Sequence, residues 1–143
     1  MNKLNRLTVF VLATLALPLA GCQKGAAAKP EGAKVVMVGK ADANGIKRIT
    51  LKELESKRLG IDFAEVTKTG DRLTMPYNAL LYDPSGGEWA FTSVEPNVYA
   101  RAALKVEAIE GDKVYLLSGP PAGTKLVTNG AAELYGIEFG VGK

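Results

Sequence analysis

Turn-forming residues recur at short intervals through the second half of this sequence and leave room only for short strands. Groups of Gly, Pro, Asn and Asp begin 9 to 15 residues apart, close to the spacing of roughly eight to twelve that is typical of antiparallel sheets. The groups occupy 69–71, 83–87, 95–97, 110–112, 119–123 and 129–130. The spacing predicts an all-β fold for residues 46–143, a small antiparallel β-barrel or sandwich.

The segments between the turns define the expected elements. Strands are expected at 35–38, 46–50, 61–68, 72–75, 80–82, 88–94, 98–109, 113–117 and 125–128, with one helical turn at 131–135. One short helix is expected at 51–59, because Thr50 and Glu53 have the spacing of a capping box. Gly60 fits the left-handed position that ends such a helix.

The composition excludes several kinds of chemistry. The chain has one Cys and no His, so it lacks a disulfide partner, the commonest metal ligand and the commonest general base. Without the two basic residues of the N-terminal segment, 16 basic and 15 acidic side chains remain, and no basic stripe indicates nucleic-acid binding. We therefore expect a contact module with no enzymatic activity, no cofactor and no metal site.

The N-terminal residues have the three parts of a secretory signal. Lys3 and Arg6 precede an apolar run at 7–21, which ends in small residues. The run is interrupted by Pro18 and is shorter than the roughly 20 apolar residues of a membrane-spanning helix. Residues 1–21 are therefore expected to be a cleaved signal peptide.

The signal ends in Leu19-Ala20-Gly21-Cys22, which resembles the lipobox of bacterial lipoproteins. In that family the cysteine is lipidated and becomes the first residue after cleavage. The alternative is an ordinary signal peptide with a chance cysteine. The resemblance implies a periplasmic protein anchored to a membrane through Cys22, with residues 22–45 as a lipidated N-terminus and flexible tether. Gln23 and Lys24 leave the choice between the inner and outer membrane open.

The region from Met75 to Leu134 resembles the membrane-proximal part of periplasmic adaptor subunits. These adaptors, also called membrane fusion proteins, belong to resistance-nodulation-division (RND) efflux pumps. The matching positions form an ordered series: Pro76 and Ala79; Gly87, Trp89 and Phe91; Arg101; Gly111 and Asp112; Gly119; Gly123; and Gly130. The sequence departs from the family at Pro120 and Pro121, which follow Gly119 where the adaptors continue with Leu.

A second, weaker match lies upstream, at 49–51 and 59–66. In the adaptors the two matched stretches are far apart in sequence and meet in space. The lipoyl domain, and usually a helical hairpin, lie between them. Here only a short turn separates Val66 from Leu73. The resemblance therefore implies a docking module without the parts that reach toward an outer-membrane channel.

Seven residues are candidates for more specific roles. Trp89, Phe91 and Tyr99 are expected in the core, with a ligand groove as the alternative. Three acidic residues beside turns are expected to cap those turns, with cation binding as the alternative: Asp83, Glu88 and Asp112. Arg101 is expected to keep its head in solvent, with a partner contact as the alternative.

The expected function is that of a lipid-anchored periplasmic docking protein. Its partner would be an inner-membrane RND transporter or a full-length adaptor, and it would support transmembrane efflux. Two alternatives stay open: a lipoprotein that binds a small ligand or a metal, and a truncated adaptor remnant.

Overall fold

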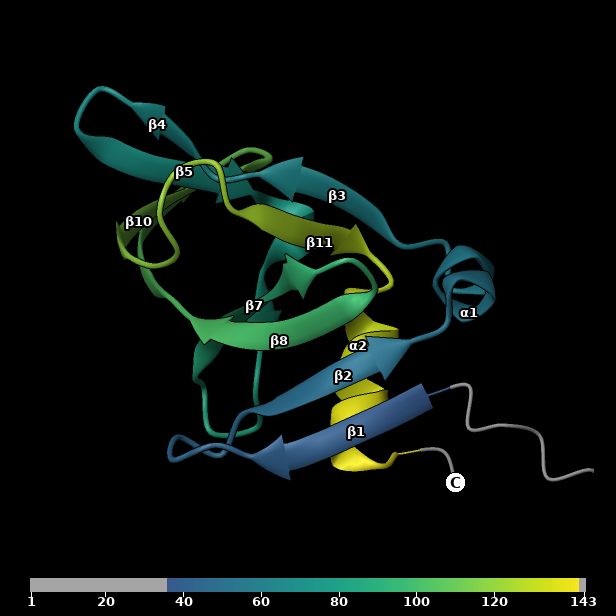
Figure 1. Ribbon diagram of the computed structural model, residues 1–143. Helices are drawn as coiled ribbons and strands as arrows, with labels where there is room; N and C mark the ends of the chain where they lie inside the picture. Colours follow the sequence, from purple (N-terminus) through teal and green to yellow (C-terminus); the bar gives the residue numbers. More distant parts are fainter. Residues whose placement is uncertain (1–35, 142–143) are drawn as a thin grey trace, which may run out of the picture. The chain divides into compact units, whose positions relative to one another are not determined.

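The computed structural model describes residues 36–141, which form two antiparallel sheets and two α-helices (Figure 1). The expected all-β class is confirmed. Of the two architectures expected, the sheets form the sandwich-like one, and they do not close into a barrel. Within the described residues, the strands that pair on one side only are β1, β3 and β6 in the larger sheet and β4 and β9 in the smaller.

The larger sheet has the strand order β1-β2-β8-β7-β11-β3, and β6 pairs with β7 at its side. Its strands are β1 (Val36–Ala41), β2 (Lys47–Leu51), β3 (Asp62–Glu65), β6 (Leu81–Tyr82), β7 (Glu88–Glu95), β8 (Val98–Ala103) and β11 (Lys125–Asn129). The early strands of the described chain flank the later ones in this sheet, because β2 pairs with β8 and β3 pairs with β11.

The smaller sheet has the order β4-β5-β10-β9. Its strands are β4 (Thr67–Thr69), β5 (Arg72–Pro76), β9 (Lys105–Glu110) and β10 (Lys113–Ser118). A short 3₁₀ helix, η1 (Tyr77–Ala79), follows β5, and the β4–β5 hairpin projects from the sheet (Figure 1).

The expected continuous strands 61–68 and 98–109 are both wrong, because each is two strands in different sheets. The first breaks at Val66 and the second at Leu104, whose exposed fractions are 1% and 9%. Both residues lie in the same apolar cluster between the sheets. At each break an apolar side chain packs into this cluster where the chain passes from one sheet to the other. The backbone stays hydrogen-bonded at the first break, because the Val66 N–H donates to Thr124 O at 2.9 Å.

The helix before β3 begins later than expected. Helix α1 spans Glu53–Arg58, with Lys52 at its N-cap and no side-chain capping bond, so the expected capping box is wrong. Thr50 and Leu51 belong instead to β2, because the Leu51 N–H bonds Asn97 O at 3.0 Å. The expected end of the helix is confirmed, since Gly60 has a φ of +61°, which favours glycine.

The folded region begins upstream of the expected boundary at residue 46. Residues of the expected tether form β1, which pairs with β2 from Val36 opposite Leu51 to Ala41 opposite Lys47. The turn between them is held by Asp42, whose Oδ1 accepts the N–H groups of Asn44 and Ile46. The described residues of the strand expected at 35–38 lie in β1, and the expected tether 22–45 therefore overlaps the folded region at 36–45.

The expected helical turn at 131–135 is the first part of a longer helix, α2 (Ala131–Phe139). Ala131 and Leu134 pack into a core cluster against the larger sheet, together with Ile49, Phe91 and Tyr99. The helix begins after Gly130 and ends at Gly140, both with positive φ. Its length was missed because the residues after Tyr135 have no clear apolar periodicity.

Candidate functional site

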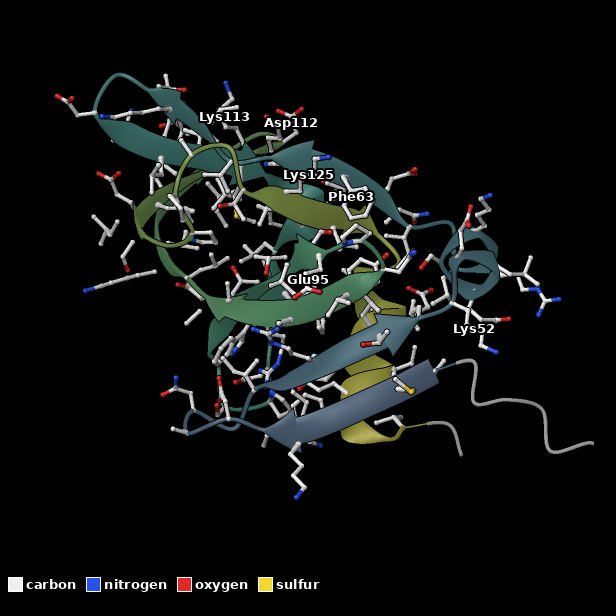
Figure 2. All side chains as sticks on the ribbon, viewed as in Figure 1. Lys52, Phe63, Glu95, Asp112, Lys113 and Lys125 are labelled. Atoms are coloured by element: carbon white, nitrogen blue, oxygen red, sulfur yellow. The ribbon has the colours of Figure 1, made fainter. Side chains whose placement is uncertain are left out.

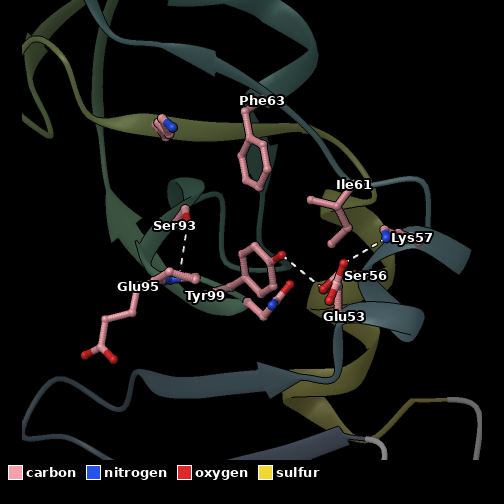
Figure 3. A pocket seen from close by; sticks show the side chains of 11 residues that line it. Glu53, Ser56, Lys57, Ile61, Phe63, Ser93, Glu95 and Tyr99 are labelled. Carbon is pink, nitrogen blue, oxygen red and sulfur yellow. Dashed lines mark hydrogen bonds and ion pairs between the residues drawn. The ribbon is translucent and has the colours of Figure 1, made fainter.

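A groove of about 510 Å³ lies where α1 faces β3 and the turn between β7 and β8 (Figure 3). We call it the Tyr99 groove. It is lined by Glu53, Ser56, Lys57, Ile61, Phe63, Ser93, Glu95, Pro96, Asn97, Tyr99 and Lys125. The groove is positioned by three elements that are distant in sequence, and pairing within the larger sheet brings them together.

The hydroxyl groups of Tyr99 and Ser56 form the inner part of the groove. Their oxygens are 3.2 Å apart and hydrogen-bonded, and both residues are buried (Figure 3). Ser56 is the buried residue of α1, so this bond ties the helix to β8. Because a single hydrogen bridges the two oxygens, the second hydroxyl hydrogen remains to donate to another acceptor.

An aromatic side chain covers the groove from β3. The ring of Phe63 is nearly parallel to that of Tyr99, with centroids 6.3 Å apart and an interplanar angle of 15°. Phe63 is 45% exposed, whereas Tyr99 is 1% exposed. Lys125 projects beside Phe63 from the neighbouring strand β11 (Figure 2). The groove therefore presents an accessible aromatic surface on a fixed support.

The charges around the groove are unevenly compensated. Glu53 and Lys57 form an ion pair at 2.8 Å. Its hydrogen bond and charge attraction lower the pKa of Glu53 and raise the pKa of Lys57. Glu95 lies 3.7 Å from Arg48. Lys125 forms no ion pair within the described residues, so its charge is the uncompensated one among the lining groups.

A buried ion pair lies outside the groove, where β8 meets α2. Arg101 Nε and Nη2 donate to the two carboxylate oxygens of Glu138 at 2.6 and 3.1 Å. The guanidinium also lies 4.3 Å from the ring centre of Trp89 and 4.9 Å from that of Phe139. The expected solvated position of Arg101 is therefore wrong, because α2 covers this part of the sheet.

Asp83 has the expected role of a turn cap. Its carboxylate accepts hydrogen bonds from Ser85, from the Gly87 N–H and from Trp89 Nε1. These bonds lower the pKa of Asp83 to about 2, and the bond from the Ser85 hydroxyl has the largest effect. Glu88 instead accepts the Val106 N–H at 2.7 Å. Within residues 36–141, no group of three or more acidic, Cys or His side chains is arranged to hold a metal.

The residues that carry the adaptor resemblance lie in turns and in the core. Phe91 and Ala79 are fully buried, and Trp89 is half-buried against Asp83. Gly87 has no room for a side chain, because a Cβ atom there would lie 2.6 Å from Asp83 Oδ2. The others end β5, turn the chain or precede α2: Pro76, Gly111, Asp112, Gly119, Gly123 and Gly130. Among the groove residues, only Tyr99 is a candidate from the sequence, as a core residue with a ligand groove as the alternative. The other groove residues were not predicted as site residues.

Cys22 and the preceding Leu19, Ala20 and Gly21 lie outside the described residues. Neither helix in the described part of the chain has the length and apolar character needed to span a membrane. Comparisons with protein families, with curated proteins and with solved structures found no match.

Proposed function

We propose that this protein is a lipid-anchored periplasmic docking module that associates with an RND-type efflux transporter or its full-length adaptor. The observation that supports the proposal is the pairing of two sequence stretches, one at 49–51 and 59–66 and the other at 75–134. Both resemble the adaptor membrane-proximal domain. Ile49 pairs with Tyr99 and Ala64 pairs with Leu126, so strands from the two stretches form one sheet. The resemblance implies such a pairing, because the two corresponding stretches of the adaptors also meet in space.

The connection between the two stretches limits the proposed role. In the adaptors a lipoyl domain lies between them, whereas here the β4–β5 hairpin joins them through a turn at Gly70. The proposal therefore includes contact near the inner-membrane transporter and excludes a bridge to an outer-membrane channel. Its mechanism is shape-complementary contact without chemistry.

The proposed anchor adds to such a contact. A lipidated Cys22 confines the domain to a membrane surface, which raises its effective concentration toward any partner in the same membrane. Two or three acyl chains make the attachment durable, because a single chain binds only marginally. A weak docking surface then suffices for assembly.

The proposal is tested by crosslinking in the native host, followed by purification of the tagged full-length chain and mass spectrometry. The matched control joins residues 1–35 to an unrelated small domain, so that the anchor is kept and the β-domain is lost. We expect an RND transporter subunit or a full-length adaptor with the full-length chain and not with the control. Repeated recovery of neither from the full-length chain contradicts the docking function.

A truncated adaptor remnant remains the opposing hypothesis, and deletion of the gene distinguishes it. A docking role predicts reduced tolerance to the compounds that the partner pump exports. A remnant predicts unchanged tolerance. The Tyr99 groove favours the ligand-binding alternative.

A further inference from the structure

We propose that the Tyr99 groove binds a small amphipathic acid, a molecule with an aromatic or other flat apolar body and one carboxylate. This site goes beyond the docking role and does not depend on it, because it rests on the groove alone. Three properties of the lining lead to this class of ligand: its size and apolar surface, its uncompensated charge, and its hydroxyl donors.

The size and apolar lining suit a small molecule. Ligand sites usually enclose roughly 300–1,000 Å³ and are lined mainly by apolar and aromatic groups with a few polar ones. The Tyr99 groove has about 510 Å³, with Ile61, Phe63 and Pro96 as its apolar groups. Phe63 is 45% exposed although it rests on the buried Tyr99 ring. Contact with a flat ligand would cover this surface at little cost in side-chain freedom.

The charge of the lining favours an anion. Lys57 is held by Glu53 at 2.8 Å, and Glu95 lies beside Arg48. Lys125 is exposed, and Glu65, which is opposite it in the β3–β11 register, forms no ion pair with it within residues 36–141. Among the ionised side chains that line the groove, Lys125 is the one without an ion pair in the described residues, and a carboxylate that meets its ammonium would compensate that charge.

The hydroxyl pair adds a donor at the inner end of the groove. One of the two hydroxyl hydrogens of Ser56 and Tyr99 lies between their oxygens. The other is available to a ligand oxygen. An acid that lies with its ring on Phe63 therefore finds donors at the Lys125 ammonium and at the hydroxyl pair, both of which line the same groove (Figure 3).

The experiment measures binding of two matched probes by fluorine NMR. The probes are a trifluoromethyl-naphthoate and its uncharged primary amide, which have the same ring and differ in charge. The full-length chain is reconstituted in lipid nanodiscs, and empty nanodiscs give the background from partition into lipid. We expect the acid to bind about fivefold more tightly than the amide, the upper end for an exposed ion pair.

Two groove variants separate the charge from the aromatic contact. Lys125→Gln should remove the preference for the acid and leave the amide unchanged. Phe63→Ala should weaken both probes by about fivefold, because both use the ring surface. The matched controls are Lys113→Gln, an exposed strand lysine of the other sheet, and Tyr77→Ala, which replaces an aromatic residue that is 48% exposed. Both controls should leave the two affinities unchanged.

Three results would overturn the proposal: no binding above the nanodisc background, equal affinities for acid and amide, or a preference that survives Lys125→Gln. Circular dichroism of each variant shows whether it is folded, and a variant that fails to fold is replaced by Lys125→Met or Phe63→Leu. Failure of this test leaves the docking function standing. Failure to recover a transporter leaves the groove standing, because the probe experiment contains no partner protein.

Discussion

The sequence predicts that Arg101 is exposed to solvent, whereas the fold buries it. In a strand of alternating residues, an arginine normally keeps its charged head in water. Here its partner is Glu138, 37 residues away on α2, and the side chains of the pair are 6% and 1% exposed. Breaking a buried ion pair destabilises the protein, because the removal of one partner leaves an uncompensated charge in the interior.

We expect Arg101→Met and Glu138→Gln each to lower the free energy of unfolding by about 3–5 kcal/mol. The double variant Arg101→Met/Glu138→Leu should recover most of that loss, because it buries no charge. Urea unfolding followed by circular dichroism measures all three. The control is Arg72→Met, which removes the partly exposed pair with Glu107 at 3.7 Å and should cost less than about 1 kcal/mol. Comparable losses at Arg72 and Arg101 would contradict this account.

Asp83 should titrate well below an ordinary carboxyl group. Its pKa falls from 3.8 to about 2, because the Ser85 hydroxyl, the Gly87 N–H and the Trp89 indole donate to the ionised form. A lowered folded pKa contributes stability that is complete above about pH 4 and is lost as the pH falls toward 2. Carbon-detected NMR titration measures the value directly.

The matched variants for this titration are Ser85→Ala and Asp83→Asn. Ser85→Ala should move the pKa of Asp83 back toward 3.8, since the Ser85 hydroxyl bond has the largest effect. Asp83→Asn should remove this part of the dependence of stability on pH. A pKa of Asp83 near 3.8 in the unmodified chain would contradict the hydrogen-bond network.

Among the elements, α1 depends most on a contact outside itself. It has six residues, and isolated helices of that length are unstable in water. Its N-terminus has no side-chain cap, and its one leucine, Leu54, is 58% exposed. The buried Ser56 is the residue through which the helix bonds Tyr99 on β8.

We expect Tyr99→Phe to destabilise the protein by about 1 kcal/mol, because the buried Ser56 hydroxyl loses its partner. Amide hydrogen exchange should increase in α1 more than in β10 or β11, which identifies the helix as the element released. Tyr115→Phe is the matched control, since the Tyr115 hydroxyl has no hydrogen bond among residues 36–141 and the residue is also buried. Equal exchange changes in the two variants would show that α1 does not depend on this bond.

For the whole molecule, the two matched sequence stretches and the N-terminal anchor define the proposed role. Within the described residues, Gly111, Gly123 and Gly130 occupy turns with positive φ between the elements of the two sheets and α2. The anchor belongs to residues outside the described part of the chain and remains a prediction from the lipobox.

Cys22→Ser should prevent lipidation and move the protein out of the membrane fraction. In the unmodified chain, mass spectrometry of the N-terminal peptide should show cleavage before Cys22 and added acyl chains. Lys24→Ser is the control, because it changes the same segment while keeping the Leu-Ala-Gly-Cys sequence. Membrane association that is unchanged by Cys22→Ser, with an unmodified N-terminal peptide, would contradict the anchor.

Local signals predicted much of the fold. The turns at Asp83–Gly87 and at Gly111 were identified because Asp, Pro and Gly determine local backbone geometry. The hairpin of β9 and β10 followed from the short turn between them. The same local reasoning failed at Thr50 and Glu53, where a capping-box pattern competed with pairing of β2 to β8. Pairing prevailed because Leu51 is buried in the core and bonded to Asn97.

The sequence by itself determined the all-β class, most turns, the glycine that ends α1 and the candidate anchor, because each depends on residues that are neighbours in the chain. Only the tertiary structure decided that the strands change sheet at Val66 and Leu104, that Arg101 is buried with Glu138, and that Ser56, Phe63, Tyr99 and Lys125 line one groove. These features arise from contacts between segments far apart in sequence. The stability of these contacts depends on which faces of the sheets are covered by other elements. The local pattern of polar and apolar residues does not contain that information.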